Sequence, residues 1–219
     1  MKGMSWWLGC WLCLCAGPIA GANSRPWERP LDQWSEADVI RILSDSPWAK
    51  PAAARARGLA ESSRRFHRGD SSPWPGSAQV TVRLESALPV RMALLKAGIA
   101  PPEDHGAERT CIAVVEFANG WNGDSLVAGD WRDARAWLGA TGAAPIPAAE
   151  ARLVERGANG FALVFVFPAD GDLISPRLLQ LPFLKRDLKT LDFLAEIGFF
   201  EVERRFSAAA LTFHGRREF

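Results

Sequence analysis

Apolar and polar residues alternate along several stretches after residue 78, and this alternation predicts strands there. Residues 79–85 alternate strictly, so we expect a strand with one exposed and one buried face, the buried face carrying Val80, Val82 and Leu84. Residues 111–117 are apolar at every position except Glu116. That pattern is typical of a central strand that is covered on both faces.

Two hairpins are predicted farther along the chain. Residues 151–155 and 161–167 have strand patterns and are separated by a turn rich in Gly at 157–160. A second hairpin is expected over residues 191–206, with its turn near Gly198. Apolar side chains fall on alternate positions of its second strand, at Phe200, Val202 and Phe206.

A helix is predicted over residues 36–45 by its start and stop signals. Ser35 has the position of an N-cap, and Asp38 follows three residues later as its partner in a capping box. Pro47 ends the helix, because the residue before a proline resists the helical conformation. The buried stripe of this helix is expected to hold Val39, Ile40 and Leu43.

Two further helices are expected, and together the elements indicate a fold class. One helix has Ser86 as its cap, Pro89 in its first turn and Gly98 as its stop, with an apolar face of Leu88, Met92 and Leu95. The other passes through Trp131, Ala134, Trp137 and Leu138. The sum predicts an α+β fold, a mainly antiparallel sheet with two or three packed helices.

Composition divides the chain into four segments. Residues 1–22 are a leader, 23–49 an N-terminal segment with one helix that packs on the main domain, 50–77 a basic flexible linker, and 78–219 the α+β domain. The linker is rich in Ala, Arg, Ser, Gly and Pro. It is either a solvated connector or an arm that touches anionic surfaces such as lipid headgroups.

The leader has the organisation of a secretory signal peptide. Lys2 provides the positive start, residues 6–14 the apolar core, and residues 20–22 the small residues that signal peptidase accepts. Cleavage is therefore expected after Ala22, which would release the protein into the periplasm or the extracellular space. Retention of the leader as a membrane anchor is the alternative, because its apolar run is almost long enough to span a bilayer.

Charge and cysteine content narrow the classes of function. The chain has 26 Lys and Arg residues against 25 Asp and Glu residues, and loss of Lys2 with the leader makes these numbers equal. A neutral chain has no bulk attraction to nucleic acid, so no nucleic-acid partner is expected. Cys111 is the only cysteine after the leader, and a lone cysteine forms neither an internal disulfide nor a cysteine-based zinc site.

Two candidates for catalytic groups each have a structural alternative. Cys111 is a candidate nucleophile, assisted by one of the three histidines, His67, His105 and His214. Its place at the start of an apolar strand favours instead a small buried hydrophobic residue. Glu85 and Glu116 are a candidate acid–base pair near the ends of neighbouring strands, although solvated carboxylates are also common there.

Binding residues are predicted in the segment 45–49, Asp-Ser-Pro-Trp-Ala. Pro47 stiffens this turn and thereby holds Trp48, either in a groove of a partner or against this domain itself. Trp121, in a turn of Asn and Gly residues, is a further candidate platform. The scattered histidines give no metal site, and no phosphate-binding or hydrolase motif is present, so neither metal nor cofactor is expected.

Four patches of the sequence resemble an uncharacterised family of exported bacterial proteins. These patches are residues 34–39 (WSEADV), 42–49 (ILSDSPWA), 83–91 (RLESALPVR) and 165–168 (FVFP). The resemblance implies export and a single structural unit. It implies no reaction and assigns no catalytic residues.

The sequence as a whole predicts an exported, non-catalytic module that acts by binding or as part of an assembly. The pattern behind this prediction is a complete leader and an ample apolar core without a recognisable catalytic constellation. Its partner would be a protein or a ligand of the cell envelope, and membrane contact would require the basic residues of 50–77. An exported hydrolase of an unrecognised type, using Cys111 or the pair of Glu85 and Glu116, is the alternative.

Overall fold

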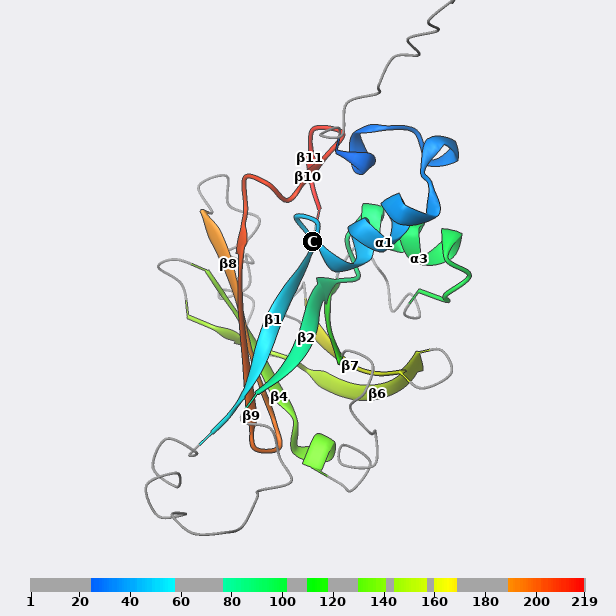
Figure 1. Ribbon diagram of the computed structural model, residues 1–219. Coiled ribbons are helices and arrows are strands. Elements are labelled where there is room, and N and C mark those ends of the chain that lie inside the picture. The colour runs from blue at the N-terminus through cyan, green and yellow to red at the C-terminus, as the bar shows by residue number, and fades with distance from the viewer. Residues whose placement is uncertain are drawn as a thin grey trace, which may run out of the picture.

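A single antiparallel sheet dominates the fold. The computed structural model describes residues 25–57, 77–101, 110–117, 130–140, 144–156, 160–168 and 189–218. Nine strands in these ranges pair in the order β5-β4-β8-β9-β1-β2-β3-β7-β6 (Figure 1). Their bounds are β1 Ala49–Ala56, β2 Ser77–Leu84, β3 Thr110–Phe117, β4 Arg135–Ala140, β5 Ile146–Pro147, β6 Glu150–Arg156, β7 Gly160–Pro168, β8 Thr190–Ile197 and β9 Phe200–Ser207. A small ribbon near the C-terminus pairs β10 (Thr212–Phe213) with β11 (Arg216–Arg217).

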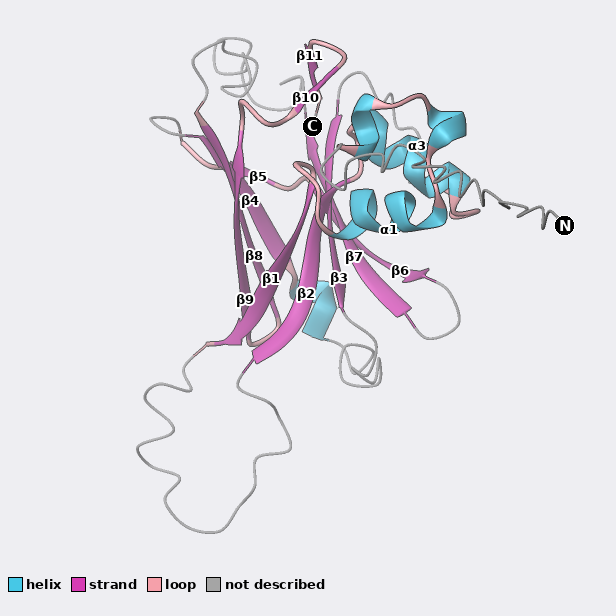
Figure 2. Ribbon diagram, turned by 45° about the horizontal axis from the view of Figure 1, so that its top comes forward, coloured by secondary structure: helices cyan, strands magenta, loops and turns pink. Residues whose placement is uncertain are grey.

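The sheet curls so that strands from its two ends face each other across one core (Figure 2). Four strands lie between β8 and β7 in the sheet order. Phe193 of β8 nevertheless packs against Phe165 and Phe167 of β7, with ring centroids 6.0 and 6.4 Å apart. The concave face of the sheet therefore encloses the main apolar core.

The chain between β5 and β6 bridges the two ends of this curled sheet. The backbone N–H of Ala148 donates to the carbonyl oxygen of Ala136 in β4 at 2.8 Å. The next residue, Ala149, donates to the carbonyl oxygen of Val166 in β7 at 2.8 Å. The result is a half-barrel in which this short segment links β4 to β7, each the neighbour of an end strand.

The strands expected over 79–85 and 111–117 are confirmed as β2 and β3. The predicted buried residues of β2 are at most 3% exposed and lie on the concave face: Val80, Val82 and Leu84. β3 lies between β2 and β7 and is buried on both faces, its outer side packing in a second cluster of Ile112, Val114, Ala162, Val164 and Val166. Both hairpins are confirmed as β6–β7 and β8–β9, and Gly198 has a φ of +57° in the second turn.

The first predicted helix is confirmed as α1 (Glu36–Ser44), and its capping box is formed. The hydroxyl of Ser35 accepts from the backbone N–H of Asp38 at 3.2 Å, and the Asp38 carboxylate accepts from the backbone N–H of Ser35 at 2.9 Å. The expected buried stripe is partly wrong. Val39 and Ile42 are buried, whereas Ile40 is 59% exposed.

The second predicted helix is present as α3 (Leu88–Lys96), but its cap and its buried face differ from the prediction. Ser86 does not cap it, because its hydroxyl accepts from the backbone N–H of Ile112 at 3.0 Å. The buried side is Pro89, Val90, Ala93 and Leu94, whereas Leu88 and Leu95 are 43% and 64% exposed. This helix has apolar residues of its own on nearly every face, so the sequence pattern alone does not determine which face is buried. Packing against α1 determines it. Gly98, with a φ of +71°, follows the helix as predicted.

The helix predicted through Trp131 to Leu138 is wrong. A short 3-10 turn, η3 (Asp130–Asp133), is followed there by β4. The residues match a helical spacing, but 135–140 also alternate, with Ala136 and Leu138 buried and Trp137 half-buried on the outer face. Pairing with β8 decides between the two patterns.

The linker predicted over 50–77 is wrong in its first part. Residues 49–56 form β1, which pairs with β2 and β9 in the middle of the sheet. Small alanines, among them the buried Ala52 and Ala54, let this strand fit between its neighbours. Residues 58–76 lie outside the described ranges.

The predicted α+β class is also wrong, and the fold is closer to mainly β. The described residues contain one nine-stranded sheet and two α-helices, and both helices lie together at one end of that sheet (Figures 1 and 2). β1 and β4, which were expected to be linker and helix, are strands and raise the strand content of the fold. Neither α1 nor α3, and no other helix in the described ranges, has the length and apolar character needed to cross a bilayer.

Candidate functional site

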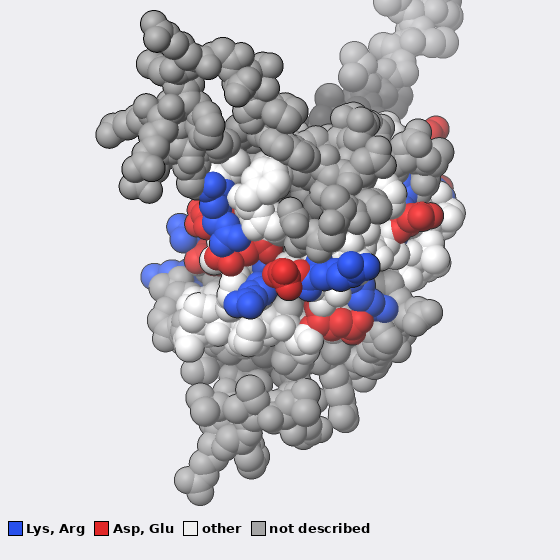
Figure 3. All heavy atoms as spheres, turned by 90° about the horizontal axis from the view of Figure 1, so that it is seen from below, with Lys and Arg blue, Asp and Glu red and all other residues white. Residues whose placement is uncertain are grey.

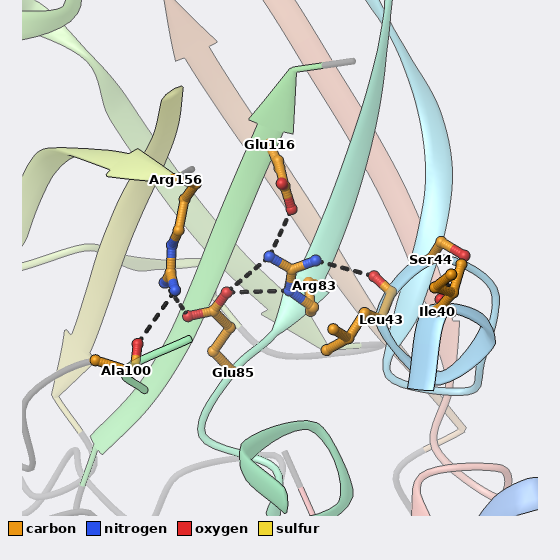
Figure 4. A network of polar contacts seen from close by, with 8 residues as sticks. All are labelled: Ile40, Leu43, Ser44, Arg83, Glu85, Ala100, Glu116 and Arg156. Carbon is orange, nitrogen blue, oxygen red and sulfur yellow. Dashed lines mark hydrogen bonds and ion pairs between the residues drawn. The ribbon is translucent and has the colours of Figure 1, made fainter. Parts of the chain in front are cut away.

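Four charged side chains gather on the outer face of the sheet, close to α1 (Figure 4). Arg83 lies at the end of β2 and Glu85 directly after it, two residues apart and therefore on the same side of the strand. Glu116 comes from β3 and Arg156 from the end of β6. The pairing of β2 with β3 and of β6 with β7 brings these residues to one place.

Arg83 is the centre of this charge cluster. Its Nε and Nη2 atoms lie 3.0 and 2.9 Å from Oε1 of Glu85, and Nη2 lies 2.6 Å from Oε2 of Glu116. Its Nη1 donates to the carbonyl oxygen of Leu43 at 2.9 Å. Leu43 lies in the last turn of α1, where the helix dipole favours a cation. All three guanidinium nitrogens of Arg83 are therefore engaged.

Arg156 completes the cluster from the other side. Its Nη2 lies 2.7 Å from Oε2 of Glu85, and its Nη1 donates to the carbonyl oxygen of Ala100 at 3.2 Å. The Glu85 side chain is fully buried between the two arginines, whose side chains are 5% and 8% exposed. A buried carboxylate between two buried arginines is stable only while these partners stay in place. The cluster thus ties α1 and the chain after α3 to the sheet.

The predicted pair of Glu85 and Glu116 is brought together by the structure, with Arg83 between the two carboxylates. Sequence reasoning missed both arginines. A signal existed for Arg83, which occupies the polar side of the alternating stretch beside Glu85. No such signal existed for Arg156, because its approach to Glu85 depends on strand pairings between distant parts of the chain.

A groove of about 560 Å³ lies above this cluster, bounded by α1 and the loop after α3. It is lined by Ile40, Leu43, Ser44, Thr81, Arg83, Ile99, Glu116, Phe117 and Arg156. Ile40 and Ile99 on its rim are 59% and 36% exposed. A groove of this volume, with exposed apolar walls and a few polar groups, is typical of binding sites.

Glu116 is the charged group of the cluster that is most open to a ligand. Its side chain is 34% exposed, against 5% for Arg83. Oε2 of Glu116 contacts Arg83, and among the described residues Oε1 has no hydrogen-bond donor. A carboxylate only accepts hydrogen bonds, so the groove offers an acceptor with negative charge beside its apolar rim.

Cys111, the candidate nucleophile, is buried and only 5% exposed. Burial raises the pKa of its thiol from 9.0 to about 12, although a contact with the Ser86 hydroxyl at 3.9 Å lowers it in part. The thiol is therefore protonated at neutral pH, whereas a nucleophile requires the thiolate. His214 is exposed in the β10–β11 turn with its ring against Phe213, and His67 and His105 lie outside the described residues.

Trp48, a predicted binding residue, is fully buried within the chain itself. Its ring packs edge-on against Trp27 at 5.8 Å and Phe213 at 6.3 Å between centroids. Its Nε1 donates to the carbonyl oxygen of Glu218 at 2.8 Å. Trp48 therefore packs against this domain itself, which was one of the two predicted alternatives, and not in a groove of a partner. Pro47 is half-buried beside it, and Trp121 lies outside the described ranges.

Charges of both signs are mixed on the molecular surface. Figure 3 shows one face on which Lys and Arg side chains lie directly beside Asp and Glu side chains. On the described part of this face no extended area carries a single sign. In the described ranges, no three His, Cys, Asp or Glu residues are placed to hold a metal ion.

Comparisons of the chain with protein-family models, with curated proteins and with solved structures gave no match. The resemblance to exported bacterial proteins therefore stays a prediction. The groove beside α1 has two distinctive features, an apolar rim and a half-exposed carboxylate.

Proposed function

We propose that this protein is an exported, non-catalytic binding module of the cell envelope or the extracellular space. In this proposal the groove beside α1 holds an apolar side chain and a neighbouring basic group of a partner polypeptide. The observation that carries the proposal is the half-exposed carboxylate of Glu116 beside the apolar rim formed by Ile40 and Ile99.

The chemistry of the groove favours a ligand that is partly apolar and partly basic. Burial of an apolar side chain against the rim is favourable by about 25 cal/mol for each Å² removed from water. Oε1 of Glu116, which has no donor among the described residues, can accept a hydrogen bond from an ammonium or guanidinium group, and such charge-assisted bonds are stronger than neutral ones. Arg83 and Arg156 repel a basic group little, because their charges are balanced by Glu85 and Glu116.

The same contacts argue for binding over catalysis. Glu85 accepts hydrogen bonds from both arginines and is fully buried, so its carboxylate is not accessible to a substrate. The thiol of Cys111 is buried and neutral. Cys111 and the pair of Glu85 and Glu116 were the candidates for hydrolysis, and the surroundings of Cys111 and Glu85 support a structural role for each.

Fluorescence anisotropy with two labelled peptides tests the groove. We expect Leu-Lys-Leu to bind and Leu-Glu-Leu to bind at least tenfold more weakly, because only lysine matches Glu116. Glu116→Gln keeps the shape but removes the charge-assisted bond, which contributes about 1.5–3 kcal/mol, so affinity for Leu-Lys-Leu falls about tenfold or more. Ile40→Gln removes apolar area from the rim and also weakens binding.

Leu95→Gln is the matched control for the rim variant. Leu95 is an exposed apolar residue on a helix, as Ile40 is, but it lies outside the groove. Its replacement leaves the affinity unchanged. Equal binding of the two peptides, or wild-type affinity in both groove variants, contradicts the proposed ligand chemistry.

Export is tested separately by the intact mass of the protein isolated from its source cells. The proposal expects a chain that begins at Asn23, because cleavage follows Ala22. A chain that still begins at Met1 and is recovered from the cytosol contradicts export without bearing on the groove.

A further inference from the structure

A second hollow lies on the outer face of the sheet, over β4 and β8 at the opposite end of the strand order from β6. Its volume is about 570 Å³, within the range of small-ligand sites. We call it the β4–β8 hollow and define it by Trp137, Gly139, Pro145, Asp192, Leu194 and Glu196. None of these residues lines the groove beside α1.

Gly139 creates the depth of this hollow. It pairs with Asp192 across the two strands, next to the pair of Trp137 and Leu194. Among the described residues, a Cβ atom added at Gly139 would meet Asp192 alone, at 3.8 Å, which is an ordinary contact distance. The space above Gly139 is therefore open, and the half-buried Trp137 lines one side of it.

The polar edge of the hollow presents donors and acceptors side by side. Oδ1 and Oδ2 of Asp192 accept from Nε and Nη2 of Arg205 at 2.6 and 3.2 Å. These side chains are 40% and 71% exposed, so both keep hydrogen-bonding capacity toward a ligand. Glu196 at the other end is paired with Arg57 at 2.8 Å.

We propose that the β4–β8 hollow binds one pyranose ring of a glycan. The C–H face of a pyranose packs on the apolar face of an indole, here that of Trp137. Its neighbouring hydroxyl groups each donate and accept, which matches the adjacent carboxylate of Asp192 and guanidinium of Arg205. Gly139 leaves the space that the ring occupies.

The charge balance of the hollow favours a sugar over a cationic ligand. An aromatic ring flanked by carboxylates also attracts ammonium groups. Here, however, both oxygens of Asp192 already accept hydrogen bonds from Arg205, unlike those of Glu116, of which only Oε2 has an arginine partner among the described residues; Glu196 is paired with Arg57. A neutral polyol keeps these ion pairs intact, whereas a cation competes with the arginines for the same oxygens.

Saturation-transfer NMR of the full-length protein with cellotriose, maltotriose and chitotriose tests this site. At least one of the three sugars receives saturation at its ring protons. Gly139→Val fills the hollow with a side chain suited to a strand and weakens that binding at least tenfold. Trp137→Ala gives a similar loss and serves as the second variant should Gly139→Val fail to fold.

Ser207→Val is the matched control, because it adds the same side chain at an exposed position of β9 outside the hollow. It leaves the sugar signal unchanged. The proposal is overturned if none of the sugars is saturated, or if Gly139→Val and Trp137→Ala bind as the wild type does. Tetramethylammonium is added as a cationic probe. If it receives saturation and the sugars do not, the proposal is overturned and the hollow is a cation site.

Discussion

Glu85 is the residue on which the charge cluster depends most. Glu85→Gln keeps the shape but leaves two buried arginines without their shared counter-charge. Removing one partner of a buried ion pair costs about 3–5 kcal/mol, and we expect a loss of that size in the free energy of unfolding. Urea denaturation followed by circular dichroism measures it.

Glu116→Gln is the control for that prediction. The Glu116 side chain is 34% exposed and has one arginine partner among the described residues, so we expect a loss of about 1 kcal/mol or less. Equal losses in the two variants would show that Glu85 has no special place in the cluster. The two variants also separate stability, which depends on Glu85, from binding, which depends on Glu116.

Cys111 gives the protein a specific response to alkaline pH. Its pKa rises from 9.0 to about 12 on folding, so between these values the unfolded chain has lost a proton that the folded chain keeps. The free energy of unfolding therefore falls as pH rises through this window, by about 1.4 kcal/mol per pH unit from this group.

Urea titrations at about pH 8 and about pH 10.5 measure this effect, for which we expect a difference of about 2 kcal/mol from the thiol. The chain contains no Tyr, whose phenol would otherwise titrate in the same window. The Cys111→Ala variant has no thiol at this position, so we expect it to lack this part of the fall in the free energy of unfolding. An equally steep fall in Cys111→Ala would show that the thiol is not its source.

At the scale of single elements, α3 gives the sharpest contrast between neighbouring positions. Leu94 is fully buried and Leu95 is 64% exposed. Leu94→Ala should lower the free energy of unfolding by about 2–5 kcal/mol through lost burial and a cavity. Leu95→Ala should change it by less than about 0.5 kcal/mol. A larger loss for Leu95→Ala than for Leu94→Ala would show that the buried face of α3 is the one predicted from the sequence.

Elements specified by local interactions could be predicted from the sequence. The capping box of Ser35 and Asp38 and the turn at Gly198 involve residues close together in the chain, and both are present. β1 and β4 were missed because Ala-rich and Trp-containing segments have weak patterns of their own. Each becomes a strand through neighbours that lie far away in the sequence.

The candidate site could be predicted only in part for the same reason. Glu85 and Glu116 were singled out as carboxylates near strand ends, and β2 and β3 do pair. Arg156 reaches Glu85 across 71 positions of sequence, through the order β2-β3-β7-β6. The exposure of Ile40 also depends on the orientation in which α1 packs against the sheet. The hydrophobic periodicity of the helix does not determine that orientation.

At the scale of the whole molecule, the curled sheet separates stability from recognition. Its concave face encloses one apolar core, closed where Phe193 of β8 meets Phe165 of β7. Its outer face carries both the groove beside α1 and the β4–β8 hollow. Substitutions of exposed or half-exposed outer-face residues such as Ile40 and Glu116 therefore change binding with little effect on the core, whereas the buried Glu85 of the same face supports stability.

Amide chemical-shift mapping shows, residue by residue, whether ligands bind in the groove beside α1. Leu-Lys-Leu added to the ¹⁵N-labelled protein should shift the amides of Leu43, Ile99 and Glu116, which line the groove, and leave those of the β8–β9 hairpin in place. Shifts confined to other regions, or no shifts at concentrations that saturate the anisotropy signal, would contradict the account.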